Sequence, residues 1–228
     1  MEAIVLAGGF GTRLHKVVAD VPKPMAPIAG RPFLEILLSS LSRKGFSRVV
    51  LSLGFKAKLI SDFFGSRFAG MDLEYVVEEI PLGTGGATRL AAASCDRDHF
   101  FVFNGDTYLD LDAERLEELW QTKKNSIVVG RWVQDTARFG RLLLKDDRIT
   151  SFDEKGISGS GVINAGCYVL ARDALSKFPL NQPFSIEIDY LNHEVINKAV
   201  YAFVTEGMFI DIGVPEDYAR AQILFASV

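Results

Sequence analysis

Through its first 106 residues the chain alternates short apolar runs with helical patterns. Apolar residues three and four positions apart predict helices over residues 30–45, 59–64 and 84–93. Between them lie runs with the length and apolar character of buried strands, at residues 3–7, 48–55, 72–79 and 99–106. Strands that alternate with helices predict an α/β fold, a Rossmann-like mixed but mostly parallel sheet flanked by helices.

The second half of the chain has a different pattern. After residue 125 closely spaced strands are predicted at residues 126–133, 140–147, 148–155 and 161–170, followed by a helical piece at 172–178. This half is expected to mix α and β structure, with local antiparallel pairing. No linker rich in Pro, Gly or Ser separates the halves, so we expect a single domain over residues 1–228 that divides near residue 124.

Charge and hydropathy exclude several classes of partner. The net charge of −4 gives no basic field for nucleic acid or an anionic membrane surface. No apolar run approaches the roughly 18 residues of a membrane span, and we expect a cytoplasmic protein. Cys95 and Cys167 lack metal-ligand spacing and are expected to be small buried apolar residues rather than a disulfide.

The segment LAGGFGTRL, residues 6–14, places glycines and an arginine at the end of the first predicted strand. A dinucleotide fingerprint beginning at Gly9 would need glycine or alanine where Leu14 stands, and no P-loop lysine follows. What remains is a turn whose backbone N–H groups, together with Arg13, suit a polyanion such as a phosphate chain. The alternative, a tight turn with Arg13 in solvent, is equally compatible with this segment alone.

Two carboxylates follow apolar runs at positions where a sheet would gather its loops. Asp106 ends the predicted strand at 99–106, and Asp211 precedes a glycine turn and a helix expected from Pro215. Each taken singly is more often a helix cap or a turn residue. Together with a phosphate-binding turn they suit Mg²⁺, which is commonly held by a few protein oxygens plus substrate phosphates.

Further polar residues give weaker signals. Lys23 stands between Pro22 and Pro24, which restrict the loop, so that the lysine has less freedom to lose on meeting an anion; an ordinary surface lysine is the alternative. Lys155 follows Glu154 in a strand-like segment, and Asn164 opens INAG, predicted to form a turn suited to sugar hydroxyls.

Taken in order, the segments LAGGFGTRL, VPKPM, PLGTGGA, NGD, FDEK, INAG and IDIGVPEDY resemble the sugar-1-phosphate nucleotidyltransferases over almost the whole chain. The resemblance implies the nucleotide-diphospho-sugar transferase fold. It also implies a reaction in which a nucleoside triphosphate and a sugar 1-phosphate give a nucleotide-sugar and pyrophosphate. The segment EEIPLGTGGA and the short length resemble most the members that use GTP and a heptose 1-phosphate for bacterial surface polysaccharides.

The resemblance also implies roles for matching residues. Lys23 would neutralise the reacting phosphates, Arg13 the departing pyrophosphate, and Asp106 and Asp211 would hold Mg²⁺. The sugar phosphate would contact Gly140, Glu154, Lys155 and Asn164. Residues 1–124 would form the nucleotide-binding half, with contacts from Leu6, Ala7, Gly8, Gly9, Gly11, Thr12, Arg13, Pro81, Gly83, Thr84, Asn104 and Gly105.

Some features depart from the family or leave alternatives open. Gly156 follows FDEK where many relatives have proline, and HKVVADVP replaces a commoner segment before Lys23. Glu187 and Asp189 resemble an acidic pair before a family helix, and we expect capping or packing rather than catalysis from them. GTP with mannose 1-phosphate, UTP with an N-acetylated sugar phosphate, a non-catalytic nucleotide-sugar sensor and a homodimer all remain alternatives to test.

Overall fold

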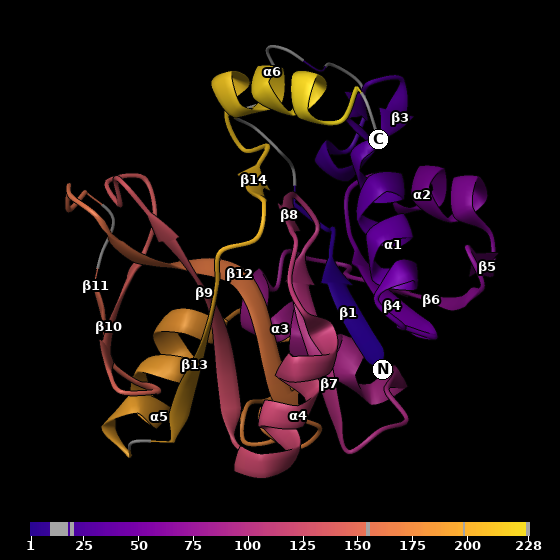
Figure 1. Ribbon diagram of the computed structural model, residues 1–228. Helices are drawn as coiled ribbons and strands as arrows, with labels where there is room; N and C mark the ends of the chain where they lie inside the picture. Colours follow the sequence, from indigo (N-terminus) through magenta and orange to yellow (C-terminus); the bar gives the residue numbers. More distant parts are fainter. Residues whose placement is uncertain (10–17, 19–20, 154–155, 198, 227–228) are drawn as a thin grey trace.

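A computed structural model describes the chain except for residues 10–17, 19–20, 154–155, 198 and 227–228. Its centre is a ten-stranded sheet with the order β10-β11-β13-β9-β12-β7-β1-β4-β6-β5 (Figure 1). The strands of the first half are β1 (Glu2–Leu6), β4 (Arg48–Leu53), β5 (Arg67–Phe68), β6 (Met71–Val77) and β7 (His99–Asn104). Those of the second half are β9 (Ser126–Val133), β10 (Arg141–Lys145), β11 (Arg148–Asp153), β12 (Gly161–Ala171) and β13 (Val200–Thr205).

The two halves of this sheet pair differently. Strands β6, β4, β1 and β7 are all parallel, as the alternating pattern predicts. Strand β12 runs antiparallel to both β7 and β9, and β10 runs antiparallel to β11, whereas β13 and β9 are parallel. The predicted mixed sheet is confirmed, with its parallel part concentrated in the first half.

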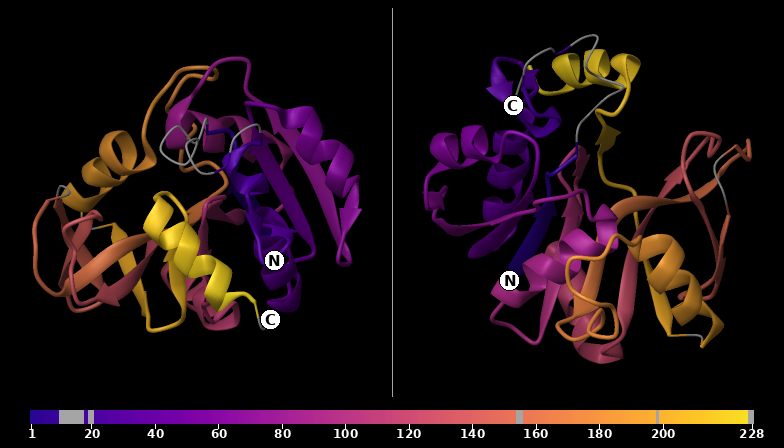
Figure 2. Two further views of the ribbon diagram at one scale, coloured as in Figure 1. Left: turned by 90° about the horizontal axis from the view of Figure 1, so that it is seen from above. Right: turned by 180° about the vertical axis from the view of Figure 1, so that it is seen from behind.

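Helices cover both faces of the sheet, as the burial of successive residues along β1 requires. On one face lie α1 (Phe33–Arg43), α2 (Ala57–Phe64) and α4 (Ala113–Lys123), whose apolar residues share a core with Ala3 and Val5. On the other, Ile4 packs in a core with α3 (Gly83–Ala91), a π-helical turn at Ile186–Leu191 and α5 (Asn192–Ile196), which Figure 2 shows from two further sides.

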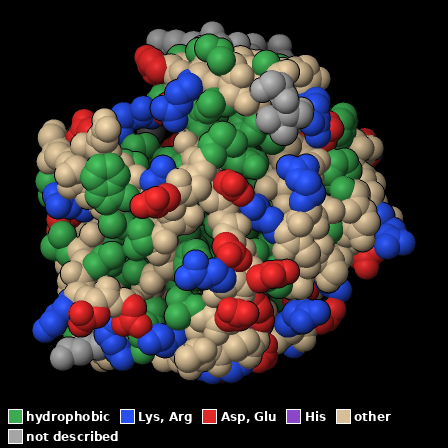
Figure 3. Space-filling view, in the orientation of Figure 1, with side chains coloured by type: hydrophobic (Ala, Val, Ile, Leu, Met, Phe, Trp, Pro, Cys, Tyr) green, Lys and Arg blue, Asp and Glu red, His purple; other side chains and the backbone are tan. Residues whose placement is uncertain are grey.

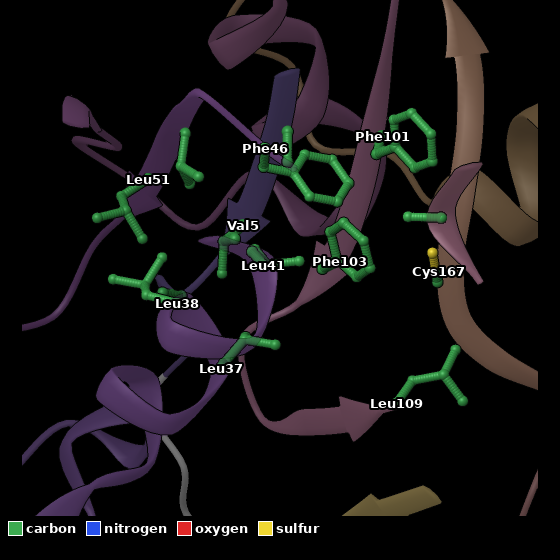
Figure 4. Packing of buried hydrophobic residues seen from close by; sticks show 14 of the residues in the cluster. Val5, Leu37, Leu38, Leu41, Phe46, Leu51, Phe101, Phe103, Leu109 and Cys167 are labelled. Carbon is green, nitrogen blue, oxygen red and sulfur yellow. The ribbon is translucent and has the colours of Figure 1, made fainter. Parts of the chain in front are cut away.

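The core beneath α1, α2 and α4 contains several aromatic contacts. The Phe46 ring meets Phe101 edge-on with ring centroids 5.0 Å apart, and Phe103 at 5.7 Å, beside Leu41 of α1 (Figure 4). Cys167 of β12 lies in the same core, and Cys95 in the opposite one. Both thiols are free and buried, which confirms their predicted role as small apolar residues, and burial raises the pKa of Cys95 to about 12.

A third, smaller core carries the elements that reach over the end of the sheet. The short strands β8 (Thr107–Leu109) and β14 (Phe209–Asp211) pair antiparallel, and α6 (Pro215–Leu224) follows β14. Ile28, Phe33, Tyr108, Ile210 and Phe225 pack together here. In Figure 1, α6 therefore lies above the carboxyl ends of the parallel strands.

Three details differ from the sequence expectations. Residues 172–178, predicted as helical, form successive turns joined by hydrogen bonds such as Ser176 N–H to Asp173 O. Helix α4, which the sequence pattern did not predict, is capped by the Asp112 carboxylate, which accepts from Arg115 N–H at 3.1 Å. INAG, predicted as a turn inside the strand expected at residues 161–170, continues that strand as part of β12, where the register with β9 shifts between Asn164 and Tyr168 as in a β-bulge.

Candidate functional site

A cavity of about 340 Å³ opens at the carboxyl ends of β1 and β7. This is the edge at which an open α/β sheet binds its ligands. It brings together the predicted nucleotide residues that the structure describes: Leu6, Ala7, Gly8, Gly9, Pro81, Gly83, Thr84, Asn104 and Gly105. Gly11, Thr12 and Arg13 lie outside the described residues.

The glycines of this cavity permit close contacts between neighbouring loops. A Cβ at Gly8 would lie 2.7 Å from Glu78 Oε1 and 3.2 Å from Gly54 N, and one at Gly105 would lie 2.7 Å from Leu6 O. Among the residues that the structure describes, a Cβ at Gly9 would meet no heavy atom within 4 Å. Packing against described neighbours therefore restricts Gly8 and Gly105 but not Gly9.

Glu78, just after β6, also lines this cavity, and the sequence reasoning missed it. Its Oε2 accepts from Leu82 N–H at 2.9 Å, and its Oε1 accepts from the Ser52 hydroxyl at 3.3 Å. Burial raises the pKa of this carboxyl, against the opposing effect of these two hydrogen bonds. Glu78 thus ties the end of β4 to the loop before α3.

The glycine-rich start of α3 packs against a segment from the second half of the chain. Gly85 N–H donates to Phe184 O at 2.9 Å, and a Cβ at Gly85 would overlap the Phe184 ring. A Cβ at Gly86 would lie 2.5 Å from Gln182 O. These glycines join the two halves, a role that the motif PLGTGGA does not reveal from sequence alone.

Lys23 and two carboxylates meet beside this cavity. Lys23 Nζ donates to Asp106 Oδ2 at 2.5 Å and lies 3.9 Å from Asp211 Oδ1, with only 14% of its side chain exposed. Lys23 begins a short 3-10 turn (Lys23–Met25), and Asp211 ends β14, which pairs with β8 beside Asp106. Three of the residues predicted to carry the chemistry therefore lie together, and the fourth, Arg13, lies outside the described residues.

The electrostatics of this cluster favour a cation. Burial raises the pKa of Asp211, the neighbouring Asp106 charge raises it further, and Lys23 acts in the opposite direction. Adjacent carboxylates that repel each other are suited to a shared divalent ion. Within the described residues, no group of three or more His, Cys, Asp or Glu side chains could hold a metal ion.

A larger cavity of about 730 Å³ lies on the other side of Asn104, which lines both cavities. It contains Asp211 and the predicted sugar-side residues Gly140 and Asn164, whose backbones are joined by Asn164 N–H to Gly140 O at 2.9 Å. Glu154 and Lys155 fall outside the described part of the chain.

Several residues of the second cavity were missed or expected elsewhere. Tyr168 and Ser185 line it without having been predicted. Asp189 helps to cap the N-terminus of the π-helical turn at Ile186–Leu191, because its carboxylate accepts from Ser185 N–H at 2.7 Å. Glu187 instead lines the cavity and accepts hydrogen bonds from the hydroxyls of Thr84, Tyr168 and Ser185.

A third, smaller hollow of about 220 Å³ adjoins Asp211 and contains three arginines. Two of them are already paired: Arg138 and Arg220 lie 2.5 and 3.4 Å from the buried carboxylate of Asp217. Arg131 donates to the carbonyl oxygens of Gly207 and Trp132. The hollow therefore carries balanced charge and supports the loop next to Gly140.

The outer surface carries no field of one sign on the face shown in Figure 3, where acidic and basic side chains are interspersed. In the part of the chain that the structure describes, no helix has the length and apolar character to cross a bilayer.

Comparison with known proteins decides the family. The family model described as nucleotidyl transferase matches residues 2–227. The chain belongs to the nucleotidyl transferase family. The family predicted from the motifs is thereby confirmed, and so is the expectation of a transferase enzyme.

Two curated relatives share the full length of this nucleotidyl transferase. It is 38% identical to a D-glycero-alpha-D-manno-heptose 1-phosphate guanylyltransferase of Aneurinibacillus thermoaerophilus, over 97% of each chain. It is 36% identical to the protein of the same name from Campylobacter jejuni, over 96% of this chain and 97% of that one.

Solved structures agree with this assignment. HddC from Yersinia pseudotuberculosis, 39% identical, superposes with a TM-score of 0.89 over 98% of this chain and 99% of that one. A second HddC structure, complexed with GMP-PN, gives a TM-score of 0.87. A putative glucose-1-phosphate thymidylyltransferase from Bacillus anthracis has a TM-score of 0.89 at 21% identity, over 100% of this chain and 96% of that one, and shows the shared fold alone.

Proposed function

We propose that this nucleotidyl transferase transfers a guanylyl group from GTP to D-glycero-α-D-manno-heptose 1-phosphate, giving a GDP-heptose and pyrophosphate. The observation that carries the proposal is the junction of the two cavities. Asn104 lines both cavities, and the Lys23–Asp106–Asp211 cluster lies between them. The choice of GTP and heptose 1-phosphate is supported by the names of the relatives at 36% and 38% identity and by the GMP-PN complex of HddC.

In this mechanism a phosphate oxygen of the sugar 1-phosphate attacks the α-phosphorus of GTP. The bond from the α-phosphorus to the bridging oxygen of the β-phosphate breaks, and pyrophosphate leaves from the opposite side. The protein contributes position and charge rather than covalent chemistry. Lys23 is suited to neutralise both reacting phosphates because its Nζ lies at the junction, restricted by its contact with Asp106.

The Asp106–Asp211 pair fits a divalent ion, and we propose that these carboxylates hold Mg²⁺. When bound, such an ion neutralises phosphate oxygens and helps to orient the triphosphate. The pair is suited to the ion because the two carboxylates meet at a partly buried place where the pKa of Asp211 is raised by burial and by its neighbour. Among the residues that the structure describes, Lys23 is the only ion-pair partner of Asp106 and Asp211.

The remaining assignments rest on the family resemblance and on the lining of the cavities. The first cavity would receive the nucleotide, with Gly11, Thr12 and Arg13 at its phosphates. The second would receive the sugar phosphate through Gly140, Asn164, Glu154 and Lys155. A cytoplasmic location and a homodimer are proposals as well, to be tested by cell fractionation and by light scattering of the purified protein.

A second substrate pair has specific support. A mannose-1-phosphate guanylyltransferase of Mycobacterium tuberculosis is 34% identical over 96% of this chain and 63% of its own length. GTP with mannose 1-phosphate is therefore the alternative to the heptose pair.

The test is pyrophosphate release with Mg²⁺, crossing GTP, UTP, dTTP, CTP and ATP against heptose, mannose, glucose and N-acetylated sugar 1-phosphates. Release with GTP and the heptose phosphate alone is expected. Release with another pair would contradict the proposed substrates and keep the mechanism. If no pair releases pyrophosphate and the protein still binds a nucleotide-sugar, the proposed guanylyl transfer is contradicted and a non-catalytic sensor is favoured.

A further inference from the structure

One carboxylate collects hydroxyl hydrogen bonds from both halves of the molecule. Glu187 Oε2 accepts from Thr84 Oγ1 at 2.9 Å and from Ser185 Oγ at 2.7 Å, and its Oε1 accepts from Tyr168 Oη at 2.6 Å. The Thr84 hydroxyl in turn accepts from Ile186 N–H at 3.0 Å, so its own proton is directed at Glu187. In all three hydrogen bonds the hydroxyl donates and the carboxylate oxygen accepts.

Tyr168 connects Glu187 to Asn164 through a chain of hydrogen bonds. Its side chain is fully buried within β12, and burial, then Glu187, raise its pKa well above the ordinary value, so its hydroxyl keeps the proton. With that proton given to Glu187, the oxygen of Tyr168 accepts from Asn164 Nδ2 at 2.9 Å. Tyr168 therefore distinguishes the nitrogen of the Asn164 amide from its oxygen.

The other end of the Asn164 amide is fixed as well. Asn164 Oδ1 accepts from Gly166 N–H at 3.0 Å, within the β-bulge of β12. Each of these two bonds favours the same orientation of the amide. What remains is one N–H and one oxygen lone pair, on a residue that lines the 730 Å³ cavity. Such a donor and acceptor side by side match neighbouring hydroxyl groups of a sugar ring.

We propose that Tyr168 is a positioning residue for sugar recognition, which, held by Glu187, fixes the Asn164 amide so that it presents one donor and one acceptor to adjacent sugar hydroxyls. This inference rests on the proposed function, because it takes the larger cavity as the sugar site. It goes beyond that function because it explains how Tyr168, without touching the sugar, helps the cavity to recognise sugar hydroxyl groups.

The Glu187 carboxylate also holds Thr84 in place. Thr84 lines the nucleotide cavity, and Glu187 lines the sugar cavity. The hydrogen bond between them spans helix α3 and the π-helical turn. A single acceptor thus positions one wall of each cavity.

The test measures the KM for each substrate and kcat for Tyr168→Phe, using the substrate pair that gives turnover with the wild type. Loss of one orienting hydrogen bond is expected to raise the KM for the sugar phosphate about tenfold, while the KM for the nucleotide and kcat stay within about twofold. Tyr190→Phe is the matched control, because Tyr190 also loses a buried hydroxyl contact, to Ser126 Oγ at 2.7 Å, and lines neither cavity.

A double-mutant cycle with Asn164→Ala separates positioning from general support. If Tyr168 acts through Asn164, Tyr168→Phe has no further effect on the sugar KM in the Asn164→Ala background. An equal effect in both backgrounds, or an effect on the nucleotide KM alone, overturns the proposal. A wild type without turnover on any pair would instead overturn the proposed function, so the two failures are distinct.

Glu187→Gln tests the carboxylate, with Asp189→Asn as its control on the same turn. An amide has one accepting oxygen where the carboxylate has two, so the hydroxyls of Tyr168, Thr84 and Ser185 cannot all keep their acceptors. The sugar KM is expected to rise about fivefold to tenfold for Glu187→Gln and to stay near wild type for Asp189→Asn. Equal effects of the two variants would contradict a specific role for Glu187.

Discussion

The two cavities of this nucleotidyl transferase are built by different means. The smaller one is shaped by backbone: loops that follow parallel strands approach closely at Gly8 and Gly105, where a Cβ would collide. The larger one is shaped by side chains, chiefly the hydrogen bonds of Glu187, Tyr168 and Asn164. A cavity shaped by backbone therefore leaves a glycine signature in the sequence, whereas a cavity shaped by side-chain hydrogen bonds depends on tertiary contacts.

The largest expected effect lies at the junction of the two cavities. Lys23→Ala removes the ammonium group that we place between the reacting phosphates, so kcat is expected to fall about 10²–10³-fold, the scale for one preorganised charge contact. Steady-state pyrophosphate release measures it. Lys44→Ala is the control, since Lys44 also pairs with an aspartate, Asp110, at 2.5 Å but lines neither cavity. Near-wild-type turnover of Lys23→Ala would remove this lysine from the mechanism.

The next effect concerns the carboxylates on the two sides of Lys23. Asp106→Asn is expected to lower activity about 10²-fold and to weaken binding of Mn²⁺ in the presence of nucleotide, measured by calorimetry without turnover. Asp110→Asn, at the surface near β8, should leave both quantities unchanged. An unaltered metal titration for Asp106→Asn would mean that Asp106 only holds Lys23 in place.

The same contrast explains what the sequence could predict. Parallel strands end at one edge, so the pattern alone placed Gly8, Asn104 and Asp106 together, and the structure agrees. Tyr168 and Glu187 come from separate segments, and their pairing depends on how β12 and the turn at Ile186–Leu191 pack, which no local pattern encodes.

Two elements were predicted wrongly, each for its own physical reason. Helix α4 was missed because its buried stripe is narrow, with only Ala113, Leu116 and Trp120 inside. Residues 172–178 resemble a helix in composition, but they form turns between β12 and Pro179, where a short segment gains little from helical hydrogen bonds.

A smaller effect tests whether the glycines join the two halves. Gly86→Ala would place a Cβ 2.5 Å from Gln182 O and 2.8 Å from Leu82 Cβ, so the free energy of unfolding is expected to fall by about 1–3 kcal/mol, less the gain from alanine in a helix. Urea unfolding measures the change. Gly9→Ala, whose Cβ would meet no heavy atom of the described part of the chain within 4 Å, is expected to change stability by less than about 0.5 kcal/mol. If Gly86→Ala is as stable as Gly9→Ala, the backbone near Gln182 moves aside at little cost.

The smallest effect concerns Glu78, the carboxylate of the nucleotide side. Because burial raises its pKa above the ordinary 4.5, the folded protein binds this proton more tightly than the unfolded chain does. Unfolding then releases a proton, so Glu78 makes the free energy of unfolding fall as pH rises from about the ordinary pKa of 4.5 through the raised one. Glu78→Gln removes this contribution. Its stability relative to wild type is therefore expected to be higher at pH 8 than at pH 4, by less than about 1 kcal/mol because the side chain is only half-buried. Urea unfolding of both proteins at the two pH values measures the difference. The opposite sign would mean that the hydrogen bonds from Leu82 and Ser52 outweigh burial, and that the smaller cavity, like the larger one, is organised around a well-satisfied carboxylate.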